Sequence, residues 1–380
     1  MRKNVIVYSI PFGFGPTGKA IVIANELARN HSVTLITYQH SLQITTQIEY
    51  VEILDCQTRN FFFWDTKIFE KTDVLISIMD LRLLDFVAKK FPNIKTVFVD
   101  SLFWWRKSLS DLPFDSCSLF ILQSYPGVTE KLKEVPAKFI SKFYEVGPIL
   151  SANKAVENES QETDSILLHF GGVNSLIAQW EMYKQYFEFI TSIVIKYAKT
   201  HKCILIVTGN IDLMTELKHC FQFEENTLFQ CLDNGEFHKT LSKTKLFIST
   251  CGIEATYEAF AYQIPTIFLP PVNSTQLYQL MCLISLQFPV VITESLVNNF
   301  KKVILANHDY RSETIEIARV LECLVGNPSE RVVMQTGLYS FIDNAESKEN
   351  REKMLLRQND FLNKGSNKWT DVLYQAGLLK

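Results

Sequence analysis

Residues 250–276 hold the side chains best suited to bind an anionic ligand. A short turn, Thr250-Cys251-Gly252, follows an apolar run. Glu254 and Glu258 come next, four residues apart, which places them on one face of a helix. Backbone N–H groups at the start of such a helix favour an anion by about 0.3–1 kcal/mol per charge. The pattern therefore predicts an anion site at a strand–turn–helix junction.

The elements around this turn are those of an α/β unit. The apolar run 246–249 predicts a buried strand, and 253–262 contains good helix formers. Pro265 ends that helix region, 266–269 predicts a second buried strand, and Pro270-Pro271 stops it. We expect both strands to lie side by side, with the turn at their carboxyl ends.

The rest of the chain repeats this alternation of strands and helices in two halves. A polar, acidic stretch at 151–164 separates them and predicts a linker. The alternation is typical of mostly parallel sheets. The expected strands are 4–10, 32–38, 48–54, 73–79, 94–100 and 118–123 in the first half, and 165–170, 203–208, 227–231, 246–249 and 266–269 in the second.

The segment Thr-Cys-Gly-x-x-x-Thr-x-Glu-Ala, followed by Ile-Pro and Pro-x-x-x-x-Gln, resembles the donor-binding stretch of GT-B glycosyltransferases. The nearest likeness is to UDP-glycosyltransferases and the lipid-II N-acetylglucosaminyltransferase family. The resemblance implies an α/β GT-B fold with two Rossmann-like, doubly wound domains facing across a cleft. Residues 1–150 would bind the acceptor and 151–365 the nucleotide sugar, and a last helix at about 366–380 would pack back on the first domain.

The same resemblance assigns roles to residues of the second half. The turn Thr250-Cys251-Gly252 would hold the diphosphate. Glu258 would bind the ribose hydroxyls, and Gln276 would bind the sugar. The Phe-Gly-Gly turn after strand 165–170 would approach the pyrophosphate, whereas we expect His169 to be a core residue. The expected donor contacts are Gly171, Gly172, Thr250, Cys251, Gly252, Glu254, Glu258 and Gln276.

The first half opens with a glycine-rich segment, predicted as a loop over 11–19 before a helix at 20–28. It matches Gly-x-x-x-x-Gly-Lys, the phosphate-binding P-loop, but Ala20 stands where a P-loop needs Ser or Thr for Mg²⁺. We favour a loop that contacts the acceptor through Gly15, Thr17 and Gly18, and a structural turn remains the alternative. The His that relatives often carry here as catalytic base is missing.

Asp100 is the strongest candidate for that missing base. It ends strand 94–100, and an acid at the carboxyl end of a parallel strand faces the ligand crevice. Trp104 and Trp105 follow and could stack on a flat or sugar-like acceptor. The alternatives are a helix cap or an ion pair with Arg106 for Asp100, and ordinary packing for the tryptophans.

Several kinds of chemistry are not supported by the sequence. No His, Cys and Asp cluster has metal-ligand spacing, and Asp-x-Asp does not occur. The GT-B resemblance implies inverting, metal-independent transfer of a hexosyl or glucuronosyl group, without a cofactor besides the NDP-sugar, which we expect to be UDP-linked. A short likeness to synthases that join glucuronic acid to cytosine points to natural-product or nucleoside biosynthesis. A UDP-sugar 2-epimerase, an inactive NDP-sugar-binding protein and a P-loop NTPase remain as alternatives.

Composition narrows the partners and the compartment. The net charge of -3 and the absence of a long basic run disfavour nucleic-acid binding. No apolar run approaches the roughly 18 residues that a transmembrane helix needs. Eight cysteines without a Cys-x-x-Cys pair favour reduced thiols and a cytoplasmic protein. A small-molecule acceptor is the expected partner, and a homodimer is left open.

Overall fold

The computed structural model forms two compact units. The N-terminal unit comprises Met1–Asn153 and Leu362–Lys380, and the C-terminal unit comprises Lys154–Phe361. Gly172 and most of the expected linker lie outside the described residues. The described residues are 2–10, 14–37, 44–45, 51–55, 65–150, 163–171, 173, 179–363 and 367–379.

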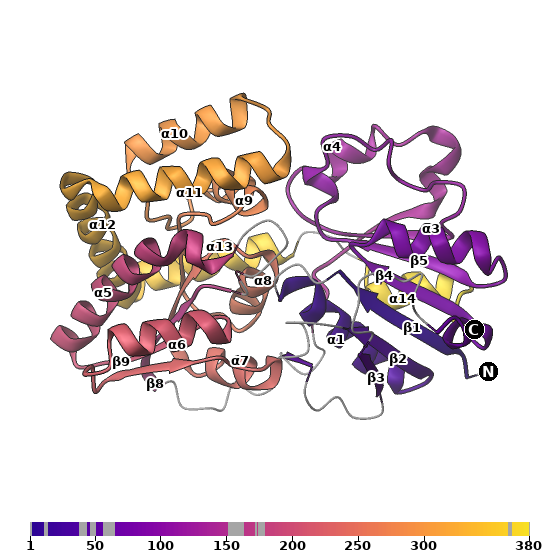
Figure 1. The fold of residues 1–380 in the computed structure, drawn as a ribbon, viewed down its shortest axis with the longest axis horizontal. Helices are drawn as coiled ribbons and strands as arrows, with labels where there is room; N and C mark the ends of the chain where they lie inside the picture. Colours follow the sequence, from indigo (N-terminus) through magenta and orange to yellow (C-terminus); the bar gives the residue numbers. More distant parts are fainter. Residues whose placement is uncertain are drawn as a thin grey trace. The chain divides into compact units, whose positions relative to one another are not determined.

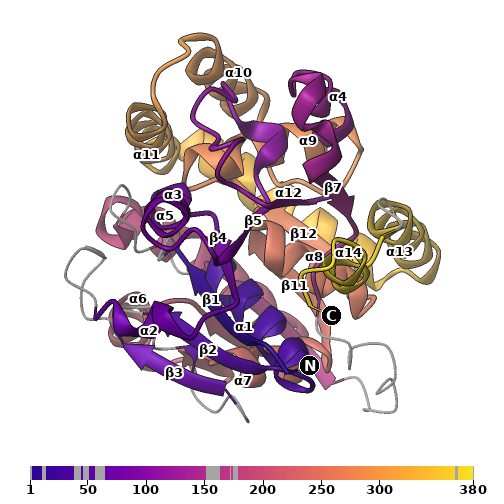
Figure 2. The same ribbon diagram turned by 90° about the vertical axis from the view of Figure 1, so that its right-hand side faces the viewer.

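The described part of the N-terminal unit contains a seven-stranded parallel sheet in the order β3-β2-β1-β4-β5-β6-β7. Figure 2 shows β3, β2 and β1 side by side. The order reverses direction at β1 and β4, so the chain winds both ways from the middle of the sheet. The strands are β1 (Asn4–Ser9), β2 (Ser32–Thr37), β3 (Val51–Asp55), β4 (Val74–Ile78), β5 (Lys95–Asp100), β6 (Leu119–Gln123) and β7 (Phe143–Val146).

Helices cover this sheet because its central strands are apolar on both faces. They are α1 (Gly15–Ala28), α2 (Lys67–Glu70), α3 (Leu81–Lys90) and α4 (Val128–Leu132). The last helix, α14 (Trp369–Gln375), belongs to the same unit. Its Trp369, Val372 and Leu373 share a core with β1, β4 and α1, and Gly147 N–H donates to Asn367 O at 3.0 Å. Figure 1 shows α14 beside β1 and β4.

The described part of the C-terminal unit contains a five-stranded parallel sheet in the order β10-β9-β8-β11-β12. Its strands are β8 (Thr163–His169), β9 (Ile204–Thr208), β10 (Thr227–Gln230), β11 (Thr244–Thr250) and β12 (Thr266–Leu269). Its helices are α5 (Lys184–His201), α6 (Ile211–Cys220), α7 (Asn234–Leu241), α8 (Ile253–Ala261), α9 (Ser274–Ser285), α10 (Glu294–Leu305), α11 (Tyr310–Gly326), α12 (Pro328–Glu346) and α13 (Lys348–Leu362). In the part of the chain that the structure describes, no helix combines the length and apolarity that crossing a bilayer requires.

These two parallel sheets confirm the predicted α/β class with two Rossmann-like units. The expected loop over 11–19 is wrong from Gly15 onward, because α1 begins there. Pro16 stands at the start of the helix, where its fixed φ angle favours a first turn, and Gly18 N–H already donates to Phe14 O at 2.8 Å. Gly15, Thr17 and Gly18 therefore belong to the first turns of a helix.

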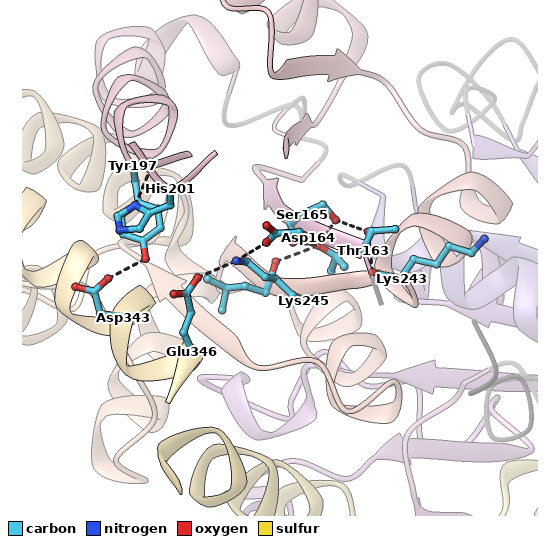
Figure 3. A network of polar contacts seen from close by, with 11 residues as sticks. Thr163, Asp164, Ser165, Tyr197, His201, Lys243, Lys245, Asp343 and Glu346 are labelled. Atoms are coloured by element: carbon cyan, nitrogen blue, oxygen red, sulfur yellow. Dashed lines mark hydrogen bonds and ion pairs between the residues drawn. The ribbon is translucent and has the colours of Figure 1, made fainter. Parts of the chain in front are cut away.

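A polar network fastens the amino ends of the C-terminal sheet (Figure 3). Lys245 on β11 binds Asp164 on β8 at 2.6 Å and Glu346 at the end of α12 at 2.8 Å. Beside it, Tyr197 OH donates to Asp343 Oδ1 at 2.8 Å. The network connects α5 and α12 to the amino ends of the strands. The carboxyl ends, where β11 leads into α8, are left to the loops.

Candidate functional site

The carboxyl edge of the C-terminal sheet brings most of the predicted donor residues together. In the register of the strands, Ser249 pairs with His169 and Thr250 pairs with Leu269. The loops after β8, β11 and β12 therefore start next to one another. Because the connections from β8 and β11 run in opposite directions along the sheet, this edge is a topological switch point, the place where open α/β sheets bind ligands.

The turn between β11 and α8 is short and held by its own backbone. Gly252 N–H donates to Thr250 O at 2.7 Å, and Thr250 Oγ1 donates to Phe170 O at 3.5 Å. Cys251 is buried, its Sγ donates to Leu269 O at 3.6 Å, and burial raises the pKa of its thiol well above the usual value. Cys251 thus packs in the core and is unsuited to act as a nucleophile.

The two described glycines of the site differ in what the fold requires of them. Gly171 has φ +71°, a left-handed conformation that favours glycine. Gly252 has an ordinary extended backbone, and a Cβ there would meet nothing closer than Thr250 O at 4.0 Å. Gly252 begins α8 without a side-chain cap, so the first N–H groups of the helix lack the usual side-chain acceptor. The fold alone does not require glycine at 252.

Glu258 lies in the second turn of α8 and is 9% exposed. Its Oε1 is 3.3 Å from Nε2 of His238 on α7. Glu254 lies one turn earlier and is half-buried. Sequence reasoning missed His238, although the Asp233-x-x-Glu236 capping box that begins α7 was a signal for that helix.

His169 is half-buried at the end of β8 and makes packing contacts with its neighbours. Its Nδ1 is 3.0 Å from Ser249 Oγ, and its ring lies 5.1 Å from that of Phe237 and 5.7 Å from that of Phe247. Desolvation in this apolar setting lowers the pKa of His169 to about 4, although the nearby carboxylate of Glu258 opposes the shift. At neutral pH the imidazole is uncharged.

The first turn of α9 carries Gln276 and is fixed by several hydrogen bonds. Asn273 caps the helix by accepting from Gln276 N–H at 2.9 Å, while Gln276 Oε1 accepts from Val272 N–H at 2.9 Å. Behind it, the buried carboxylate of Glu313 on α11 accepts from the hydroxyls of Ser274 and Tyr278. Gln276 is therefore held at the same edge as the turn after β11.

Asn210, between β9 and α6, has a side-chain donor without a hydrogen-bond acceptor in the described part of the chain. Its Oδ1 caps α6 by accepting from Leu213 N–H at 2.9 Å. Its Nδ2 is buried and has no partner among the described residues. An unmet buried donor costs about 1–3 kcal/mol. A ligand atom that accepts a hydrogen bond would remove this cost.

In the N-terminal unit, Asp100 is fully buried at the end of β5 and both its oxygens have partners. Oδ1 accepts from Leu102 N–H at 2.8 Å, and Oδ2 accepts from Arg106 Nε at 2.6 Å. Of the two alternatives to a catalytic role, the ion pair with Arg106 forms, whereas the short helix Phe103–Trp105 has no side-chain cap. Nearby, Trp104 is half-buried and stacks on Tyr125 with ring centroids 4.5 Å apart, and Trp105 is half-buried in the same short helix (Phe103–Trp105).

The start of α1 differs from a P-loop. Thr17 is buried and lies 3.2 Å from Ser9 across their hydroxyl oxygens. Lys19 is 1% exposed and its ammonium donates to Gln123 Oε1 at the end of β6. A P-loop instead wraps its backbone around a phosphate before the helix begins. The described residues thus do not support the nucleoside-triphosphatase alternative.

Comparison with known proteins shows the fold. No family model and no curated protein sequence matches this chain. The solved structure of Os79 from O. sativa in complex with UDP has a TM-score of 0.53 at 11% identity and covers 94% of this chain and 100% of that chain. The chain has the GT-B fold. A UDP-GlcNAc 2-epimerase from Methanocaldococcus jannaschii, solved with UDP-GlcNAc and UDP, has a TM-score of 0.51 at 14% identity and covers 86% of this chain and 100% of that chain.

One group of side chains among the described residues has metal-ligand spacing, and it contains none of the predicted donor residues. Glu188, Glu216 and Cys220 come together on α5 and α6. The ammonium of Lys184 forms an ion pair with the carboxylate of Glu216, so one of the three possible metal ligands already has a positively charged partner. It takes no part in the candidate site.

We predict that His169 makes stability depend on pH. Its pKa falls from 6.5 in the unfolded chain to about 4 in the folded chain, so the unfolded state binds the extra proton as the pH falls through this window. Relative to His169→Asn, the wild type should lose about 2 kcal/mol of unfolding free energy between pH 7 and pH 5. Urea unfolding at several pH values measures this difference. A constant difference from pH 7 to pH 4.5 would contradict the lowered pKa of the desolvated imidazole.

We predict that Asp100 anchors its loop. Asp100→Asn removes the partner of a largely buried guanidinium and should lower the unfolding free energy by about 3 kcal/mol. Asp111 binds the same guanidinium at 3.2 Å but is exposed, so Asp111→Asn should cost less than about 1 kcal/mol. Urea unfolding of both variants is the measurement. Equal stability of Asp100→Asn and wild type would contradict the anchoring role and favour the catalytic one.

Proposed function

We propose that this chain transfers a sugar from a UDP-sugar to a small-molecule acceptor, with inversion and without a metal ion. The observation that carries the proposal is the junction of β11 and α8. There, an uncapped helix start and a glycine that the fold does not require lie ahead of a buried carboxylate, Glu258. These are the features that a nucleoside diphosphate needs, and the GT-B fold supports this assignment.

The diphosphate would bind at the start of α8. The N–H groups there are donors, and the helix dipole favours negative charge. The lack of a side chain at Gly252 leaves room for phosphate oxygens to approach the backbone. Gly171 and the unmet Nδ2 of Asn210 are further donors or points of close approach at the same edge. Such a set would stabilise the leaving diphosphate in place of Mg²⁺.

The ribose and the sugar would bind on either side of the diphosphate. Glu258 would accept hydrogen bonds from the ribose hydroxyls, each worth about 1.5–3 kcal/mol to a charged acceptor. Gln276 and Thr250 would contact the transferred sugar, as the resemblance implies. The uridine nucleotide is proposed from relatives such as Os79, whose structure contains UDP.

The N-terminal unit would bind the acceptor. Trp104, Trp105 and the first turns of α1, with Gly15, Thr17 and Gly18, are the contacts proposed for it. The acceptor group would attack the anomeric carbon from the face opposite the diphosphate. Asp100 would have to release Arg106 before it could take the acceptor proton.

That ion pair favours a second candidate function, a nucleotide-sugar-binding protein without transfer activity. Both oxygens of Asp100 have partners, so Asp100 is not poised to act as a base. The two candidates share the donor site and differ only in turnover. UDP release from a UDP-sugar in the presence of a panel of flat acceptors would favour the transferase, and tight binding without release would favour the binding protein.

We predict that Gly252→Ala blocks the donor site without unfolding the protein. A Cβ at position 252 fits in the turn when no ligand is bound, but it would occupy the space through which the diphosphate approaches the backbone. UDP affinity should fall about tenfold or more, roughly the effect of one lost charge-assisted hydrogen bond. Isothermal calorimetry with UDP in EDTA measures the affinity, and thermal unfolding confirms the fold.

Gly337→Ala is the matched control, because a Cβ on that α12 glycine meets nothing within 4 Å. It should leave UDP binding unchanged and stabilise the helix by about 0.5–1 kcal/mol. Unchanged UDP affinity in Gly252→Ala would contradict the diphosphate position. If the wild type bound none of UDP, GDP, ADP and dTDP, the proposed function itself would be wrong.

A further inference from the structure

His238 contacts the carboxylate on which the proposed ribose site depends. Its Nε2 is 3.3 Å from Glu258 Oε1, and both side chains are largely buried, with exposed fractions of 14% and 11%. The two residues come from neighbouring helices, α7 and α8. The sequence near Glu258 does not predict this contact, because it forms only when α7 packs against α8.

The helix that carries His238 is fixed at its start by residues outside the pair. The capping box fixes the start of α7, with Asp233 Oδ1 accepting from Glu236 N–H at 2.8 Å and Glu236 Oε2 accepting from Asp233 N–H at 3.1 Å. The His238 ring also lies 6.1 Å from the ring of Tyr262 at the end of α8. The cap thus fixes the helix that places Nε2 of His238 beside Glu258 Oε1.

The other histidine near this carboxylate cannot supply the same contact. His169 directs Nδ1 to Ser249 Oγ at 3.0 Å. Desolvation lowers the pKa of His169 to about 4, so it has no charge at neutral pH. His238 is therefore the histidine whose ring nitrogen lies in direct polar contact with Glu258, at 3.3 Å between Nε2 and Oε1.

We propose that His238 is a positioning residue that fixes the carboxylate of Glu258 in the orientation that accepts the ribose hydroxyls of the donor. This inference rests on the proposed function. A Glu side chain loses rotamer freedom when it binds a ligand, and a partner that fixes it beforehand reduces that cost. His238 thereby sets how strongly the site prefers a ribonucleotide to a 2′-deoxyribonucleotide.

The test compares UDP with 2′-deoxy-UDP by calorimetry at pH 7.5. The variants are His238→Leu, which removes the donor, and His238→Gln, whose amide can place a donor near the position of Nε2. Glu258→Gln and the double variant His238→Leu/Glu258→Gln complete a double-mutant cycle. Thermal unfolding of each variant verifies that it is folded.

We expect the wild type to prefer UDP by about tenfold or more, as a hydrogen bond to a charged group implies. His238→Leu should reduce this preference about fivefold or more and weaken 2′-deoxy-UDP, which keeps only the 3′-hydroxyl, less than UDP, while His238→Gln keeps most of the preference. The double variant should show the same preference as Glu258→Gln alone. A purely structural role would weaken both nucleotides equally.

Three results would overturn the proposal. Equal weakening of UDP and 2′-deoxy-UDP in His238→Leu would show a structural role, and an unchanged preference would show no role. Additive effects in the double variant would show that His238 acts independently of Glu258. If the wild type binds UDP, any of these three results refutes only the role of His238. If the wild type binds neither nucleotide, the proposed function is wrong and this inference is wrong with it.

Discussion

The pairing of β8 with β11 is the constraint on which the candidate site depends. Parallel strands end at one edge, so the register that places Ser249 beside His169 also places Gly171 next to the turn Thr250–Gly252. The hydroxyl of Thr250 reinforces this by binding the carbonyl of Phe170. A slip of one residue would turn every strand side chain to the opposite face and separate these groups.

Buried polar groups complete the edge that this register creates. The carboxylates of Glu258 and Glu313 are buried and partnered by side chains from neighbouring helices, whereas Asn210 keeps an unmet donor. Satisfied groups rigidify a site, and unmet ones mark where a ligand atom could add a hydrogen bond. Rigid acceptors and donors of this kind suit a nucleotide whose phosphates, ribose and sugar each need fixed partners.

Much of this fold could be predicted from the sequence, because buried parallel strands consist of nearly continuous apolar residues. Leu246–Ser249 and Thr266–Leu269 are examples. The start of α1 was placed too late because its glycines suggested a loop, although Pro16 favours a helix start. His238 could not be predicted, since its contact with Glu258 joins two helices. The partners of Asp100 were foreseen only as alternatives, because a sequence shows which ion pairs are available and not which form.

The measurement that tests the central claim most directly is calorimetric titration of UDP into the wild type and Glu258→Ala, with EDTA and with Mg²⁺. The account predicts saturable binding that does not need the metal and that Glu258→Ala weakens about tenfold or more. Binding that requires Mg²⁺ and ignores Glu258, or ATP bound in preference to UDP, would contradict it.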